Sequence, residues 1–165
     1  MKNKIITLLM LLSFHGAISQ VTYFKGEWRV PGKADLFTCI CRLEIQQDTI
    51  LTAEFAWVFQ IIDSTNTELL ELYKNKNGKP GIEFAKGTYH PGTGDIYLEA
   101  TGLDDPHEIL GMTKYLLKMS ADRQTLYGNT LGIETDDPGL FCAVKMKKSG
   151  RKKYDRLKQS VKVKE

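Results

Sequence analysis

The chain has 165 residues, of which 42% are apolar, 26% charged and 10% aromatic. This composition excludes a disordered or fibrous protein, and the length suits one globular domain. The formal net charge of +3 conceals an uneven distribution, since residues 145–165 hold ten Lys or Arg and two acids, whereas residues 20–144 hold eleven basic and eighteen acidic residues. We therefore expect an acidic body followed by a basic C-terminal segment.

The first nineteen residues have the three-part layout of a secretory signal peptide. Two lysines precede an apolar run over residues 5–14, and the small residues Ala17 and Ser19 precede the expected cleavage position. The apolar run is about half as long as a membrane-spanning helix, and no later stretch is longer, so we expect no transmembrane segment. The sequence predicts an exported protein, periplasmic or extracellular, that begins near Gln20.

Apolar and polar residues alternate with a period of two through most of the remaining chain, which predicts strands. Turn-forming pairs such as Asn77-Gly78 separate the alternating runs. We expect an all-β fold over residues 20–148, namely an antiparallel up-and-down barrel of roughly eight to ten strands, with a β-sandwich as the alternative. The expected strands cover residues 23–30, 37–46, 51–59, 68–74, 82–89, 95–100, 115–119, 125–131 and 140–147.

The cysteines are Cys39, Cys41 and Cys142. Export would allow a disulfide, but Cys39 and Cys41 stand too far apart on one strand face to join each other. Closure of the sheet would bring the last strand next to the early ones, so we expect a bridge from Cys142 to Cys39 or Cys41. Three unbonded, buried side chains are the alternative, and the spacing does not suit zinc.

The sequence contains no nucleophile elbow, P-loop, dinucleotide fingerprint or His-Glu-x-x-His motif, so we assign no catalytic residue. Two acidic loops hold Asp104 with Asp105 and Asp136 with Asp137. At one rim of a barrel these carboxylates could bind calcium, although Asp-Asp-Pro is also an ordinary turn sequence. The carboxylates on the strands are instead expected to face solvent: Glu54, Glu83, Asp95 and Glu99.

Residues 149–165 form the basic tail, which we expect to be solvated and without fixed structure. A short amphipathic helix and a tail folded back onto the acidic body are the alternatives. Functionally, the tail could be attracted to an anionic surface such as phospholipid, lipopolysaccharide or nucleic acid, with no sequence-specific recognition of nucleic acid. The basic residues that would make this contact are Lys147, Lys148, Arg151, Lys152 and Lys153.

Aromatic residues gather on the apolar face of one predicted strand, at Phe55, Trp57 and Phe59, and recur at Tyr115 on a later strand. Residues in such a pattern fill a core or, in a barrel that keeps a central space, line a pocket for an apolar ligand.

The segment Gly26-x-Trp28, which we place at the start of the first strand, resembles the opening signature of the lipocalin and avidin-like calycin barrels. Thr135-Asp136 echoes a later signature of the lipocalins. The resemblance implies an eight-stranded barrel in which Trp28 plugs one end, and a habit of binding small ligands.

We therefore expect a non-catalytic, lipocalin-like binding protein for a small, largely apolar molecule, without a cofactor unless the acidic loops hold calcium. One alternative is an extracytoplasmic interaction module with a filled core that binds a protein, a glycan or an envelope surface. A small hydrolase or a cation-binding protein that uses the acidic loops is the third hypothesis. The residues expected to contact the ligand are Trp28, Phe55, Trp57, Phe59 and Tyr115.

Overall fold

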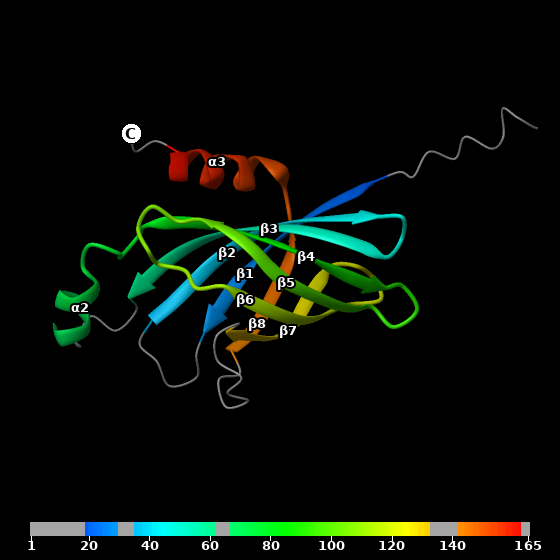
Figure 1. Cartoon of the computed structure of the whole chain (residues 1–165), viewed down its shortest axis with the longest axis horizontal. Coiled ribbons are helices and arrows are strands. Elements are labelled where there is room, and N and C mark those ends of the chain that lie inside the picture. The colour runs from blue at the N-terminus through cyan, green and yellow to red at the C-terminus, as the bar shows by residue number, and fades with distance from the viewer. Residues whose placement is uncertain (1–18, 30–34, 62–66, 133–141, 163–165) are drawn as a thin grey trace, which may run out of the picture.

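The computed structural model describes residues 19–29, 35–61, 67–132 and 142–162. The chain folds into eight antiparallel strands that close into one barrel in sequence order (Figure 1). The predicted all-β, up-and-down barrel is therefore confirmed. The strands are β1 (Gln20–Arg29), β2 (Asp35–Gln46), β3 (Ile50–Ile61), β4 (Pro80–His90), β5 (Asp95–Asp104), β6 (Thr113–Met119), β7 (Thr125–Gly132) and β8 (Cys142–Ser149).

The barrel closes where β1 pairs with β8 as well as with β2. Gly26 marks this closure, since it lies opposite Cys39 on β2 and opposite Met146 on β8. A Cβ atom at Gly26 would clash with the carbonyl oxygen of Lys145. The glycine is thus required by the close approach of the first and last strands.

Alternate residues of each strand point into the barrel, as the period-two pattern predicts. Their side chains form one buried core, to which every strand contributes. Large members of this core are Phe24, Leu43, Leu51, Phe55, Leu98, Tyr115, Leu126 and Met146.

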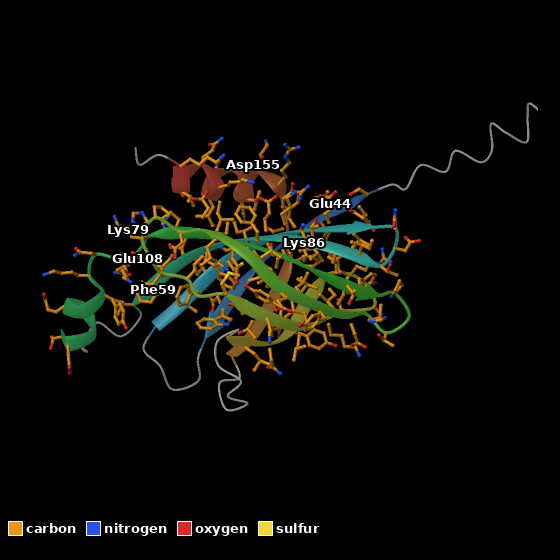
Figure 2. The ribbon with its side chains drawn as sticks, viewed as in Figure 1. Glu44, Phe59, Lys79, Lys86, Glu108 and Asp155 are labelled. Atoms are coloured by element: carbon orange, nitrogen blue, oxygen red, sulfur yellow. The ribbon has the colours of Figure 1, made fainter. Side chains whose placement is uncertain are left out.

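A second, smaller core lies on the outside of the barrel, beneath the helix α3 (Arg151–Lys162). Tyr154 and Val161 of this helix are buried against Ile40, Ala56 and Ile82 of β2, β3 and β4. Figures 1 and 2 show α3 lying across these strands, with side chains filling the space between. The expectation of a solvated tail is therefore wrong for residues 151–162, because residues 154, 157 and 161 form one apolar helix face.

The predicted strand over residues 68–74 is also wrong, since α2 (Thr67–Tyr73) is a helix. Its sequence, Thr-Glu-Leu-Leu-Glu-Leu-Tyr, is rich in Leu and Glu, which favour helix, and the run is too short for periodicity to decide. In the part of the chain that the structure describes, no helix is long and apolar enough to cross a membrane. The predicted signal peptide lies outside the described residues except for Ser19.

The strand register bears on the expected disulfide. Cys39 and Cys41 are buried, free thiols in the described structure, and the side chain of Cys142 lies outside the described residues. Gly26 of β1 pairs with Cys39 on one side and with Met146 on the other, so Cys39 and Met146 lie at the same height in the barrel. Cys142 lies four residues before Met146, which is roughly 13 Å along β8. A disulfide joins Cα atoms less than about 7 Å apart. The register thus argues against a bridge from Cys142 to Cys39, and Cys41 is two residues farther still.

Candidate ligand-binding pocket

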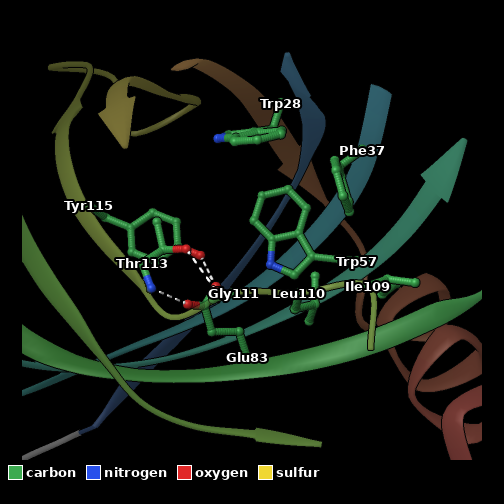
Figure 3. A pocket seen from close by; sticks show the side chains of 9 residues that line it. All are labelled: Trp28, Phe37, Trp57, Glu83, Ile109, Leu110, Gly111, Thr113 and Tyr115. Atoms are coloured by element: carbon green, nitrogen blue, oxygen red, sulfur yellow. Dashed lines mark hydrogen bonds between the residues drawn. The ribbon is translucent and has the colours of Figure 1, made fainter. Parts of the chain in front are cut away.

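A pocket of about 140 Å³ opens at the end of the barrel where β1 ends and β2 begins (Figure 3). Five strands and the connection between β5 and β6 supply its walls. The helix α2 and the residues Phe59 and Glu108 lie at this same end (Figure 2). The pocket is lined by Trp28, Phe37, Trp57, Glu83, Ile109, Leu110, Gly111, Thr113 and Tyr115.

Three aromatic rings form one wall of the pocket and meet edge to face. The rings of Trp28 and Phe37 have centroids 5.1 Å apart at 82°, and those of Phe37 and Trp57 lie 6.2 Å apart at 88°. This is the arrangement that aromatic quadrupoles favour. Trp28 is held further by its indole Nε1, which donates a hydrogen bond to Oγ1 of Thr130 at 2.6 Å. The wall is thus a fixed apolar surface.

The predicted ligand residues divide between the pocket and its surroundings. Trp28, Trp57 and Tyr115 line it. Phe55 is fully buried and stacks on both Trp57 and Tyr115, with ring centroids 5.9 and 4.2 Å away. Phe59 instead lines a neighbouring hollow of about 200 Å³ beside α2. The structure therefore brings four of the five rings together in one cluster, in which Trp57, Phe55 and Tyr115 stack and Trp28 meets Trp57 edge to face, and it leaves Phe59 outside this cluster.

Glu83 is the residue that the sequence interpretation misplaced, since its exposed fraction is only 1%. Its carboxylate accepts hydrogen bonds from the Tyr115 hydroxyl and, at 2.8 Å, from the backbone N–H of Thr113 (Figure 3). Burial raises the pKa of Glu83 to about 7, although these donors act in the opposite direction. The signal was available: Glu83 has the same strand parity as Ala85 and Tyr89, which face the interior.

Trp57 presents a buried polar group next to Glu83. Its indole Nε1 makes no hydrogen bond of normal geometry with a described residue, although it lies close enough to the Glu83 carboxylate to help lower the pKa of that group. A buried donor without an acceptor costs about 1–3 kcal/mol. An acceptor atom on a bound molecule could recover this cost.

The connection between β5 and β6 lines one side of the pocket and is shaped by Asp105. Its Oδ2 accepts a hydrogen bond from the backbone N–H of Leu110 at 2.6 Å. Lys76 tethers the same connection, because its Nζ donates to the carbonyl oxygen of Glu108 at 2.6 Å. Asp105, expected as a cation ligand, therefore orders the segment that carries residues 109–111.

The acidic loops do not assemble a cation site in the part of the chain that the structure describes. No group of three or more His, Cys, Asp or Glu side chains converges there. Asp104 ends β5, and Asp136 and Asp137 lie outside the described residues. The calcium hypothesis stays untested.

The Gly26-x-Trp28 segment lies at the end of β1 and not at its start, so Trp28 stands at the pocket end of the barrel. The closed, eight-stranded antiparallel barrel is compatible with a calycin-like fold. Comparisons of the chain with family models, with curated proteins and with solved structures give no match.

Proposed function

We propose that the protein is an exported, non-catalytic binding protein that holds a small, largely apolar molecule between Trp28, Trp57 and Tyr115. The observation that carries the proposal is an aromatic-walled pocket into which a buried indole N–H of Trp57 projects without a hydrogen bond of normal geometry. Burying an apolar ring against these walls supplies the binding free energy, at roughly 25 cal/mol per Å² before the costs of association. One hydrogen bond to Trp57 supplies orientation.

The volume of the pocket limits the size of this ligand. A dry cavity of about 150 Å³ accommodates benzene, whereas pockets for drug-sized molecules enclose about 300–1,000 Å³. At about 140 Å³, the pocket suits a single ring with a small substituent. The stacked rings of Phe55 and Tyr115 fill the interior beneath it, so the ligand does not extend deeper into the barrel.

The polar groups favour a neutral ligand that carries a hydrogen-bond acceptor. Glu83 has both carboxylate oxygens engaged, by Thr113 and by Tyr115, and its pKa of about 7 leaves much of it protonated at neutral pH. Trp57 is a donor only. A ring bearing a carbonyl or ether oxygen therefore complements the site better than a carboxylate.

The test compares acetophenone, which has one ring and a carbonyl acceptor, with toluene, which has no acceptor. Both are titrated into the ¹⁵N-labelled protein, and the indole N–H resonances of Trp28 and Trp57 are followed, assigned with a Trp28→Phe variant. We expect acetophenone to shift the Trp57 signal strongly. Trp57→Phe should weaken acetophenone about fivefold, which is the value of one neutral hydrogen bond, and change toluene less than twofold.

Tyr127→Phe is the matched control, because Tyr127 is an exposed aromatic residue on β7, outside the pocket. It should leave both affinities unchanged. The proposal fails if neither ring perturbs a pocket residue at millimolar concentration, or if Tyr127→Phe weakens acetophenone as much as Trp57→Phe does.

A further inference from the structure

A basic groove of about 690 Å³ runs over the outside of the barrel, where β8, β1 and the start of α3 meet. It lies apart from the ligand pocket and shares no residue with it. Its cationic residues come from three elements, while Glu27 is its single acidic residue. The charged residues that line this basic groove are Lys25, Glu27, Lys145, Lys147, Lys148 and Lys153.

The strand register places like charges face to face in the groove. Lys25 of β1 lies directly opposite Lys147 of β8, and like charges in this relation destabilise a sheet. Lys145 lies opposite Glu27, two pairs along the same two strands. None of the five lysines forms an ion pair with another residue that the structure describes. The protein thus holds a concentrated positive charge without enough of its own acids to neutralise it.

The docked helix gives the groove its third side. Glu54 of β3 accepts hydrogen bonds from Tyr154 and Lys158 of α3, and the ring of Tyr154 packs against Tyr23 with centroids 5.5 Å apart. These contacts fix the first turn of the helix, so that Lys153 lines the same hollow as Lys25 of β1. The basic groove then continues beneath α3 as a hollow of about 350 Å³ that adds Arg156 to Lys25 and Lys153.

We propose that this basic groove binds a ligand carrying two or more phosphate groups. The groove and the hollow beneath α3 hold five lysines and one arginine but a single glutamate. Neutralising this excess of positive charge takes several negative charges, and each phosphate monoester carries about −1.5 to −2 at pH 7. Lysine is a common phosphate ligand and contacts a phosphate as a point charge, which several lysines can do from different directions. The hollow under α3 gives the ligand an extended shape. This surface is therefore part of the barrel as well as of the C-terminal segment, because Lys25 of β1 lines it together with Lys153 of α3.

The experiment titrates sodium tripolyphosphate into the purified protein at 50 and 200 mM NaCl, by calorimetry. We expect saturable binding that weakens steeply with salt, since bound phosphates displace counterions. Lys25→Gln with Lys147→Gln should weaken binding at least tenfold. The matched control is Lys86→Gln with Lys114→Gln, which removes the same charge from β4 and β6, outside the groove. It should change the affinity less than threefold.

A melting experiment separates loss of the site from loss of the fold. Without phosphate, the Lys25→Gln/Lys147→Gln variant should melt at or above the temperature of the unmodified protein, because a repulsive pair has been removed. Tripolyphosphate should then raise the melting temperature of the unmodified protein and of the control, but not of this variant. Equal losses of affinity in both double variants, or no binding at 1 mM tripolyphosphate, would overturn the proposal.

A parallel arm distinguishes the source of the phosphates. Phosphatidylcholine vesicles with and without phosphatidic acid are sedimented with the protein. Retention by the phosphatidic acid vesicles that tripolyphosphate competes away identifies a lipid headgroup as the ligand, and absence of retention identifies a soluble phosphorylated molecule. Retention that persists in Lys25→Gln/Lys147→Gln would contradict lipid binding in the groove.

Discussion

Phe55 and Tyr115 stack face to face across the interior of the barrel, with ring centroids 4.2 Å apart and planes only 5° from parallel. They belong to β3 and β6, which do not pair with each other. Tyr115 also donates its hydroxyl to Glu83. The stack therefore joins opposite sides of the barrel, closes the base of the pocket and positions its buried carboxyl group.

Phe55→Ala should lower the free energy of unfolding by about 3–5 kcal/mol, because it removes a fully buried ring and leaves a cavity. Urea denaturation measures this change. Phe55→Leu keeps most of the volume and should cost clearly less. A loss below 1 kcal/mol for Phe55→Ala would mean that the stack does not support the barrel.

The stability of the protein should fall as the pH rises from 5 to 8. Glu83 has a pKa of about 7 in the fold against an ordinary value of 4.5, so the native state binds more protons than the unfolded state between these values. Stability falls with pH wherever this is so, here by about 3 kcal/mol at most. Urea denaturation at several pH values measures the slope.

Glu83→Gln is the control for this pH dependence, because glutamine keeps an acceptor oxygen and cannot ionise. The variant should lose most of the decline between pH 5 and 8. Hydrogen bonds from Lys158 and Tyr154 lower the pKa of Glu54 despite its partial burial. Glu54 therefore affects the stability only at a pH more acidic than this range. An undiminished decline in Glu83→Gln would assign the effect to another group.

Tyr154→Ala should destabilise the protein by about 3 kcal/mol, since Tyr154 is 2% exposed, packs on Tyr23 and donates to Glu54. Arg151→Ala, on the same helix, removes only an exposed ion pair with Asp155 and should stay within about 0.5 kcal/mol. Thermal unfolding compares the two variants. Equal, small effects would show that α3 is not docked in solution.

The thiols of Cys39 and Cys41 should resist modification in the folded protein. Burial raises the pKa of both groups well above the ordinary value, so neither forms the reactive thiolate at pH 8. An aromatic disulfide reagent should react with neither until urea is added, and then with all three cysteines without prior reduction. A single reactive thiol in urea would instead restore the predicted bridge to Cys142.

The alternation over residues 37–59 predicted β2 and β3 well, because both strands have one face in the interior and one toward solvent or α3. The same rule failed at α2, because a run of seven residues is too short to distinguish the period of 3.6 of a helix from the period of two of a strand. It also failed to place Glu83: a carboxylate in a strand suggests solvent unless its parity is compared with that of Ala85 and Tyr89.

The C-terminal helix could not be predicted because its many charged residues suggest a solvated segment. Its apolar face has only three large residues, Tyr154, Leu157 and Val161, among many basic ones, and what they pack against is set by the barrel. No local pattern shows that Ile40, Ala56 and Ile82 lie together on the outer surface. The basic groove depends in the same way on closure, which sets Lys25 beside Lys147 across 122 positions of sequence.

The absence of a side chain at Gly26 also determines how this fold could fail. Every other junction in the barrel joins strands that follow one another along the chain, whereas β1 and β8 meet only after the whole sheet has curled. A branched residue at Gly26 would hold these two strands apart. Each strand would then keep one edge whose backbone N–H and C=O groups have no hydrogen-bond partner. Such an edge can pair with the open edge of another copy. A single substitution of Gly26 by a residue with a side chain would thus convert a monomeric barrel into a polymer.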